Sequence, residues 1–225
     1  MNQQDQDMFL THAKTPSFLF KMRATQNYLR KMKKEGEIWS ISFSGGKDSL
    51  VLFHLARQCI FPFYVWHFDW GRNLMPQCYE DQLKNTLQLY NIPIAYQIYD
   101  LNTLTDPTDE SYFYQSIKNH ITNHKINVCC IGLRKEESCR RKFRLQHGLE
   151  RSYGALNIFP LKNWTWKDIW AYICLYQIPY PKSYDERADI MGWSKLRFVT
   201  FFDESYISLG QNDQDNFFNW ESKYL

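Results

Sequence analysis

The feature that most constrains the fold of this chain is a hexapeptide with two glycines, Ser-Gly-Gly-Lys-Asp-Ser, at residues 44–49. Residues 37–43 before it have the composition of a strand, and residues 48–58 after it have the apolar spacing of a helix. The two glycines allow the backbone to turn tightly and to approach an anion. Free amides at the start of a helix favour phosphate. The segment therefore predicts a phosphate-binding loop at a strand-to-helix junction.

The side chains of this loop suit the same kind of ligand. Lys47 adds a full positive charge, and the hydroxyls of Ser44 and Ser49 can donate further hydrogen bonds. The loop is not a Walker A motif, which has a first glycine where this chain has Ile41 and a serine or threonine where it has Asp48. Transfer of a γ-phosphate, as in kinases and GTPases, is therefore disfavoured.

Strands and helices alternate along the chain. Apolar runs predict strands at 37–43, 63–70, 93–99, 126–132 and 155–159, and helical spacing predicts helices at 17–35, 48–58, 76–90, 112–124 and 165–176. This alternation predicts a three-layer α/β/α fold with a mostly parallel five-stranded sheet. We expect an N-terminal helical arm at 1–36, an α/β domain that carries the loop at 37–180, and an irregular C-terminal extension packed on that domain at 181–225.

Composition excludes several classes of protein. The polar, acidic start of the chain is not a signal peptide. No apolar run reaches the roughly 18 residues that cross a bilayer. The 6 cysteines contain no Cys-x-x-Cys pair, which disfavours a zinc ribbon and a dithiol redox motif. We therefore expect a cytoplasmic protein with reduced thiols that does not bind a membrane. Its net charge of +3 does not by itself indicate that the protein binds nucleic acid.

Three further segments carry candidate site residues. Phe68-Asp69-Trp70-Gly71 ends the second predicted strand, where a carboxylate faces the ligand crevice of an open α/β sheet. Residues 131–141 read Ile-Gly-Leu-Arg-Lys-Glu-Glu-Ser-Cys-Arg-Arg, in which Arg134 can bind phosphate or sulfate with two hydrogen bonds. Residues 159–170 read Phe-Pro-Leu-Lys-Asn-Trp-Thr-Trp-Lys-Asp-Ile-Trp, with a capping box formed by Thr165 and Asp168. We interpret this last segment as a structural support of the site.

These segments together resemble a known group of enzymes. The loop resembles the PP-loop of the ATP pyrophosphatase superfamily, whose members cleave ATP between the α and β phosphates. Residues 37–180 resemble the branch that contains phosphoadenylylsulfate (PAPS) reductases, the small subunit of bacterial ATP sulfurylase, and DNA phosphorothioation proteins. The resemblance implies an adenine nucleotide alpha hydrolase-like fold of the HUP type, with ATP and Mg²⁺ as ligands.

The resemblance also implies roles for individual residues. Lys47, Asp48 and Arg134 are expected to be catalytic, and Asp48 and Asp69 to bind Mg²⁺. The expected nucleotide-binding residues are Ser44, Gly45, Gly46, Lys47, Asp48, Ser49, Asp69, Gly132, Arg134, Arg140 and Arg141.

The cysteines bear on which branch member the chain resembles. PAPS reductases carry a C-terminal Glu-Cys-Gly segment, but the last cysteine here is Cys174. Related APS reductases bind an iron–sulfur cluster through a Cys-Cys and a Cys-x-x-Cys; this chain has Cys129-Cys130 without the second pair, so we expect no cluster. Cys139, beside Ser138 and two arginines, is a candidate sulfur carrier, and Cys78 is a weaker one.

Three functions remain open. The leading one is an ATP pyrophosphatase that adenylates an acceptor and releases pyrophosphate, so that the acceptor can receive sulfur in DNA phosphorothioation or a related pathway. Its partners would be DNA or another polyanion, contacted by the cationic stretches 21–34 and 134–151, and a cysteine desulfurase or other sulfur donor. The alternatives are a PAPS reductase or sulfate adenylyltransferase, and a non-catalytic nucleotide-binding partner protein. A homo-oligomer is also left open.

Overall fold

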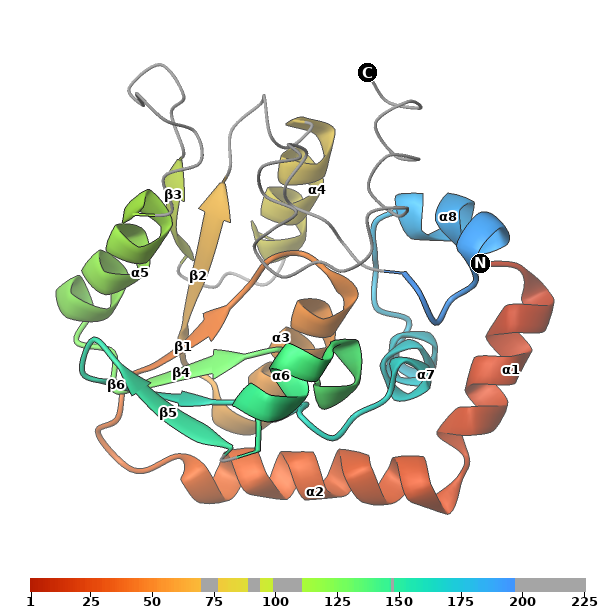
Figure 1. Ribbon diagram of the computed structural model, residues 1–225, viewed down its shortest axis with the longest axis horizontal. Coiled ribbons are helices and arrows are strands. Elements are labelled where there is room, and N and C mark those ends of the chain that lie inside the picture. Colours follow the sequence, from red (N-terminus) through yellow and green to blue (C-terminus); the bar gives the residue numbers. More distant parts are fainter. Residues whose placement is uncertain (70–76, 89–93, 99–110, 147, 197–225) are drawn as a thin grey trace.

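The computed structural model describes residues 1–69, 77–88, 94–98, 111–146 and 148–196. Within them, one six-stranded sheet lies between layers of helices, with the strand order β3-β2-β1-β4-β6-β5 (Figure 1). The strands are β1 (Trp39–Ser42), β2 (Tyr64–Asp69), β3 (Ile94–Ile98), β4 (Val128–Ile131), β5 (Leu149–Ser152) and β6 (Ala155–Ile158). The helices are α1 (Gln3–Ala13), α2 (Pro16–Met32), α3 (Lys47–Ile60), α4 (Gln77–Gln88), α5 (Ser111–Asn123), α6 (Cys139–Arg144), α7 (Trp166–Tyr176) and α8 (Ser183–Met191), with a short 3-10 helix at Lys135–Glu137.

The sheet has five parallel strands and one antiparallel edge strand. β1 pairs in parallel with β2 on one side and with β4 on the other, and β3 and β6 continue the parallel arrangement outward. β5 pairs with β6 in the antiparallel sense. The predicted three-layer α/β/α fold and its five parallel strands are confirmed; β5 is an addition, in a basic segment for which no strand was predicted. Parallel central strands place the carboxyl ends of β1, β2 and β4 at one edge of the sheet.

Alternation along β1 divides the protein interior into two sides. Trp39 and Ile41 are fully buried in the main core, which also contains the apolar faces of α3 and α7. Ser40 points the other way and its hydroxyl lies 2.7 Å from Nε2 of His120 on α5. Successive side chains of a strand point to opposite faces, so the main core covers one face of β1 and α5 covers the other.

The N-terminal helices are part of this interior. Phe9 of α1 is fully buried and lies against Trp166 and Trp170 of α7, with ring centroids 6.1 and 6.3 Å apart. Trp164 just before α7 donates its indole N–H to Thr25 of α2 over 2.9 Å. Residues 1–32 therefore support the layer that contains α3 and α7.

Helices α1 and α8 lie outside the residue ranges for which apolar spacing predicted a helix. Residues 3–13 form α1, although their sequence is mostly polar, because Asn2 caps the helix and Phe9 anchors it. Residues 183–191 form α8 within the segment expected to be irregular, and residues 197–225 of that segment lie outside the described residues. None of the described helices combines the length and apolarity that crossing a bilayer requires.

Candidate nucleotide-binding site

The hexapeptide 44–49 forms a tight loop after β1 and the first turn of α3, which begins at Lys47. Gly45 has a φ of +77°, a backbone conformation that L-residues with a side chain rarely adopt. Gly46 is the residue that caps the N-terminus of α3, with φ −69° and ψ 159°. The Ser49 hydroxyl donates to the Gly46 carbonyl over 2.8 Å, which closes the first turn. The predicted strand–loop–helix junction is confirmed by this geometry.

Two glycines of the site are required by close approaches. A Cβ atom on Gly45 would lie 2.0 Å from Cδ2 of Leu83 on α4. A Cβ atom on Gly132, just after β4, would lie 3.3 Å from the backbone of Asp48 and Ser49. The loop is therefore enclosed by α4 on one side and by the residues after β4 on the other: an added Cβ at Gly45 would displace the Leu83 side chain, and one at Gly132 would press on the α3 backbone.

Backbone amides at the start of α3 are available to an anion. Gly46 has no side chain with which to cap the helix. The Lys47 amide donates to the Tyr184 hydroxyl over 3.1 Å. Within the described part of the chain, the amides of Asp48 and Ser49 have no hydrogen-bond acceptor. Unpaired amides and the positive end of the helix dipole favour a phosphate group here.

Asp48 joins two buried cations at the base of the loop. Its Oδ2 lies 2.9 Å from Lys47 Nζ, and its Oδ1 accepts a hydrogen bond of 2.5 Å from Arg134 Nε. The exposed fractions of Lys47 and Arg134 are only 2% and 3%, so bulk water solvates neither cation. Arg134 Nη1 also donates to Glu136 over 2.7 Å. The structure thus brings together the three residues predicted to be catalytic.

The charges of this cluster shift its pKa values in a consistent way. Burial lowers the pKa of Lys47, partly countered by the adjacent Asp48. Burial would raise the pKa of Asp48, but the Lys47 and Arg134 charges outweigh it and lower that pKa to about 2. Burial would lower the pKa of Arg134, but Asp48 and Glu137 outweigh it and raise that pKa. Asp48 is therefore an anion at neutral pH, held between two cations.

A second polar cluster lies behind the loop, between β2 and α4. Nδ1 of His67 lies 2.8 Å from the carbonyl oxygen of Phe43, the residue before the loop, and Nε2 lies 2.8 Å from Glu80. A carbonyl oxygen only accepts hydrogen bonds, so Nδ1 carries a proton. Asp69 at the end of β2 accepts a bond of 3.1 Å from Lys84. These contacts fix α4 against the loop.

The predicted Mg²⁺ ligands do not form a common cluster. Both carboxylate oxygens of Asp48 contact cations, and Asp69 pairs with Lys84 on α4. Among the described residues, no three His, Cys, Asp or Glu side chains gather as a metal site would require. This arrangement fits Asp48 as a residue that orients Lys47 and Arg134.

The remaining predicted residues lie on the exposed helix α6. Arg140 is exposed, and Arg141 forms an ion pair with Glu137. Cys139, the candidate sulfur carrier, is exposed at the start of the same helix. No contact of these three side chains with the loop is present in the described structure. The side chain of Cys78 lies outside the described residues.

Several residues of the site were not found from the sequence. Tyr184, Leu83, His67 and Glu80 touch the loop or hold its neighbours, and none belongs to a motif. The spacing of Glu80 and Leu83 on α4 is the one local signal, because residues three apart share a helix face.

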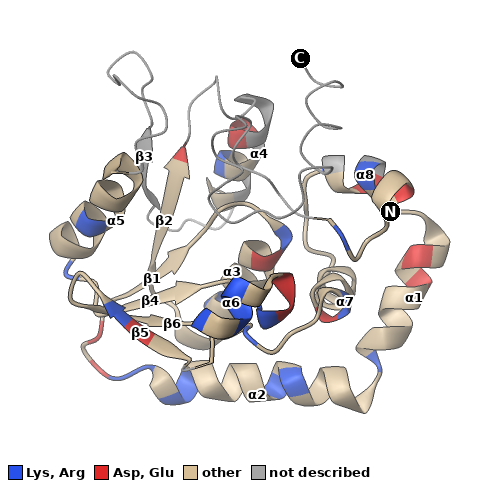
Figure 2. Ribbon diagram, viewed as in Figure 1, with Lys and Arg blue, Asp and Glu red and all other residues tan. Residues whose placement is uncertain are grey.

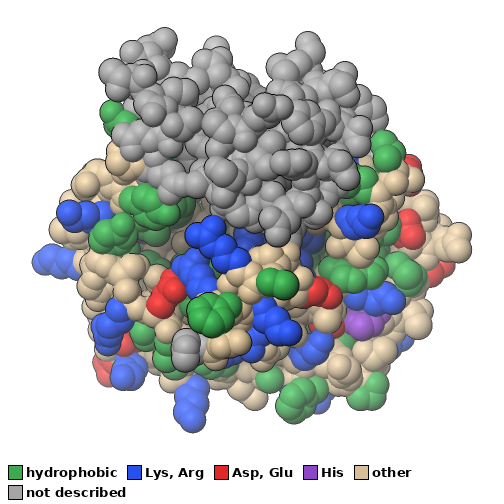
Figure 3. Space-filling model, viewed as in Figure 1, with side chains coloured by type: hydrophobic (Ala, Val, Ile, Leu, Met, Phe, Trp, Pro, Cys, Tyr) green, Lys and Arg blue, Asp and Glu red, His purple; other side chains and the backbone are tan. Residues whose placement is uncertain are grey.

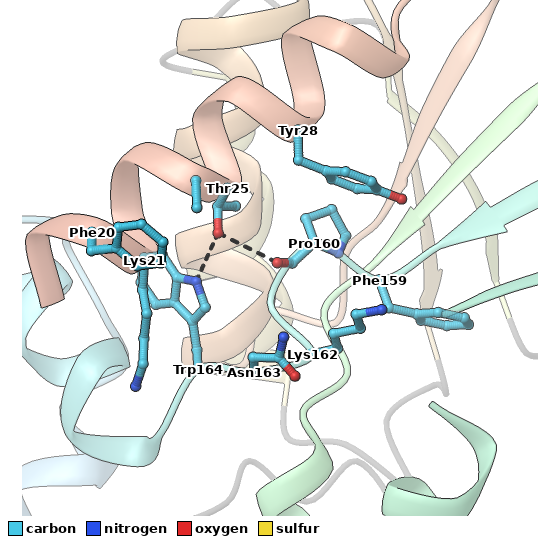
Figure 4. A pocket seen from close by; sticks show the side chains of 10 residues that line it. Phe20, Lys21, Thr25, Tyr28, Phe159, Pro160, Lys162, Asn163 and Trp164 are labelled. Carbon is cyan, nitrogen blue, oxygen red and sulfur yellow. Dashed lines mark hydrogen bonds between the residues drawn. The ribbon is translucent and has the colours of Figure 1, made fainter. Parts of the chain in front are cut away.

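A separate cavity lies away from the loop, between α2 and the connection from β6 to α7 (Figure 4). Its volume is about 270 Å³, and Tyr28, Pro160 and Trp164 are among its lining residues. Lys162 and Lys21 border it, but Lys21 is paired with Asp168. No residue of the hexapeptide lines it, so it is not the phosphate site.

Comparisons with known proteins show the family to which this chain belongs. Residues 38–214 match the model of the phosphoadenosine phosphosulfate reductase domain. Sulfate adenylyltransferase subunit 2 of Streptomyces lavendulae is 29% identical over 188 residues, which cover 69% of this chain and 59% of that protein. Adenosine 5'-phosphosulfate reductase 2 of Bacillus subtilis is 32% identical over 78 residues, which cover 35% of this chain and 32% of that protein. The chain thus spans well under two thirds of the length of both relatives.

Solved structures share the fold at low sequence identity. The U34-tRNA thiolase of Methanococcus maripaludis, solved with its 4Fe–4S cluster, has a TM-score of 0.54 and 16% identity, over 73% of this chain and 65% of that one. NMN synthetase of Francisella tularensis has a TM-score of 0.52 and 16% identity, over 72% and 71%. The family model covers most of the chain, including the loop and the Arg134 segment, and the chain therefore belongs to the phosphoadenosine phosphosulfate reductase domain family.

Proposed function

We propose that this protein binds ATP through residues 44–49, cleaves it between the α and β phosphates, and transfers AMP to an acceptor. The observation that carries the proposal is the buried cluster of Lys47, Asp48 and Arg134 beside the open amides of Asp48 and Ser49. Two buried cations share the partly buried carboxylate of Asp48 there. Arg134 has a second carboxylate partner in Glu136, so an anionic ligand at the loop would bind mainly through the free amides at the start of α3 and the Lys47 ammonium.

The geometry supports a division of roles during the reaction. The α3 amides would hold the pyrophosphate, and Lys47 would neutralise charge that develops on it as it leaves. Arg134 uses Nε and Nη1 for Asp48 and Glu136, so it is fixed in place while its remaining N–H groups can donate to a phosphate. An acceptor oxygen attacks the α-phosphorus, pyrophosphate leaves, and an adenylated acceptor remains.

A magnesium ion would enter with the nucleotide. Mg²⁺ binds phosphate oxygens and one or two carboxylates and keeps several waters. Asp69, at the carboxyl end of β2, is the proposed protein ligand, since both oxygens of Asp48 contact cations. When bound, the ion would offset negative charge on the phosphates.

The surface beside the loop supports a polyanionic acceptor. Figure 2 shows Lys and Arg residues on α6 and α2, and Figure 3 shows basic side chains gathered on the face that carries α6. Residues 134–151 contain 7 Lys and Arg against 3 Glu, whereas the whole chain has a net charge of only +3. Within the described residues, Arg140 and Lys142 form no ion pair. We propose DNA as the acceptor, with its adenylated oxygen later replaced by sulfur.

Sulfur would come from a second protein. A cysteine desulfurase, or another protein that carries persulfide, is the proposed donor. Cys139 is exposed at the start of α6, beside Arg140, and is the proposed carrier of that sulfur on this chain. Burial raises the pKa of Cys129 to about 12, which makes that thiol an unreactive alternative.

Sulfate is the second candidate acceptor. The similarity to sulfate adenylyltransferase subunit 2 over 188 residues favours this reading, in which sulfate attacks the same phosphorus. If this protein acted as sulfate adenylyltransferase subunit 2, it would need another subunit to form the complete sulfate adenylyltransferase. The non-catalytic alternative is disfavoured by the complete Lys47–Asp48–Arg134 cluster.

Product analysis distinguishes these functions. The protein is incubated with ATP labelled at the α-phosphate and Mg²⁺, alone, with DNA, or with sulfate. Labelled AMP or adenylate and released pyrophosphate are expected, and labelled ADP would exclude the proposal. Stimulation by DNA supports the first acceptor, and adenylylsulfate supports the second. Lys47→Ala should abolish turnover, while Lys118→Ala, on the exposed face of α5, should not change it.

A further inference from the structure

Helix α3 begins without a cap of its own. Gly46 occupies the capping position and has no side chain that could accept a hydrogen bond. The amide of Lys47, the first residue of the helix, donates instead to the hydroxyl of Tyr184 over 3.1 Å. Tyr184 lies on α8, 137 residues further along the chain. The hydroxyl thus satisfies, from a distant helix, the first amide of α3, whereas a serine or aspartate at the cap position would bond to the second or third amide of the helix.

Tyr184 is held firmly in this position. Its side chain is 2% exposed, and its ring packs edge-on against Trp170 of α7 with centroids 5.2 Å apart. Tyr180 lies against the same indole at 5.3 Å and donates to Asp185 of α8 over 2.7 Å. Moving the Tyr184 hydroxyl away from the loop would therefore require the ring to leave a packed aromatic cluster.

The chemical nature of this cap suits an anion site. A serine, threonine, asparagine or aspartate at position 46 would place a side chain in the loop, where the bound anion must approach. An aspartate would also add negative charge. A phenol accepts the Lys47 hydrogen bond from outside the loop and is neutral, because burial and the nearby Asp48 raise its pKa. The Asp48 and Ser49 amides remain open for the ligand.

We propose that Tyr184 is a positioning residue of the nucleotide site, which fixes the first turn of α3 so that the Asp48 and Ser49 amides point at the phosphates. This inference rests on the proposed function, in which the loop binds the pyrophosphate part of ATP. Tyr184 acts through the Lys47 amide and does not itself react. Its contribution is the same in the ground state and in the transition state, so it should affect binding and not the chemical step.

The test compares two variants that each remove one hydroxyl from the same aromatic cluster. Tyr184→Phe loses the bond to the Lys47 amide, and Tyr180→Phe loses the bond to Asp185. Dissociation constants for pyrophosphate and for Mg-ATP are measured by calorimetry, together with KM, kcat and the melting temperature. We expect Tyr184→Phe to lower the affinity for both ligands about five- to tenfold, which corresponds to the loss of one helix cap. KM should rise and kcat should stay unchanged. Tyr180→Phe should leave the affinities unchanged.

Each other outcome has a defined meaning. Unchanged or tighter binding in Tyr184→Phe refutes the positioning role, and a lowered melting temperature without a change in affinity shows a purely structural residue. An equal loss of affinity in both variants refutes it as well. If Lys47→Ala abolishes binding while Tyr184→Phe does not weaken it, only the role of Tyr184 fails. If the wild-type protein binds neither ligand, the proposed function fails and this inference with it.

Discussion

Arg134 Nε donates to Asp48 Oδ1 over 2.5 Å, although the two residues are 86 positions apart. They meet because β1 and β4 are parallel neighbours, with Ser42 opposite Ile131. The loops that follow both strands therefore leave the sheet at the same edge. Gly132 allows the close approach, since a side chain there would press on the backbone of Asp48.

Removing the charge of Asp48 should destabilise the protein. In Asp48→Asn, the buried Lys47 and Arg134 lose their shared carboxylate, and we expect the free energy of unfolding to fall by about 3 kcal/mol. Urea unfolding followed by circular dichroism measures this change. Asp189→Asn, on an exposed position of α8, is the control and should be neutral. A loss below about 0.5 kcal/mol, the usual range for surface substitutions, would contradict the role assigned to the ion pairs.

The same carboxylate should make stability depend on acid pH. Its pKa is about 2 in the folded protein and has a reference value of 3.8. Between these values the unfolded chain binds the proton and the folded protein does not, so stability falls as the pH falls. The contribution is complete above about pH 4 and is lost as the pH approaches 2.

Urea titrations of wild type and Asp48→Asn across this pH range isolate the effect, because other carboxyl groups titrate in both proteins. The difference in unfolding free energy between the two proteins should shrink as the pH is lowered. A difference that is constant from pH 5 to pH 2.5 would show that the folded-state pKa of Asp48 is not depressed.

Gly45→Ala should combine backbone strain with a steric clash. The residue has a φ of +77°, and an added Cβ would lie 2.0 Å from Leu83 Cδ2. We expect a loss of about 2–4 kcal/mol in the unfolding free energy, from a left-handed backbone and overpacking together. Gly154→Ala is a matched control, because Gly154 has a φ of +89° and nothing within 4 Å of its Cβ position, so it reports strain alone.

Leu83→Ala in the Gly45→Ala background should recover the part of the loss that the clash causes. The double-mutant cycle would then show a favourable coupling of about 1 kcal/mol or more. Additive effects of the two substitutions would mean that α4 does not press on the loop.

Asp168 should contribute more to the free energy of unfolding than its partner Lys21. It is 1% exposed, closes the capping box of α7 with Thr165, and accepts from Lys21 over 2.7 Å and from His12 over 2.8 Å. Asp168→Ala should lower the unfolding free energy by about 3 kcal/mol, because it removes a cap and a buried anion together. Lys21→Ala should lower it by about 1 kcal/mol or less, since Lys21 is partly exposed. Thermal and urea unfolding show which variant loses more unfolding free energy. A larger loss in Lys21→Ala than in Asp168→Ala would contradict the role assigned to Asp168.

The local sequence pattern was sufficient to locate the five parallel strands of the sheet and the loop after β1. Apolar runs identified β1, β2, β3, β4 and β6 because a strand buried on both faces is apolar along its length. The strand–glycine–helix order identified the tight loop before α3 because glycine conformations and helix starts are properties of neighbouring residues. A weak pattern did not give the bounds of two elements: α1, within the predicted helical arm at 1–36, is polar and depends on Phe9, and β5 is exposed and basic and depends on pairing with β6.

The sequence by itself therefore determined the fold class, the strand–loop–helix junction at 44–49, and the choice of Lys47, Asp48 and Arg134 as its candidate charged residues. Only the tertiary structure decided that Asp48 pairs with both cations, that Leu83 closes over Gly45, and that Tyr184 caps α3. The physical reason is that a motif records contacts between near neighbours in the chain. The partners of a loop at the edge of a parallel sheet depend on strand order and helix packing, which join residues far apart in sequence.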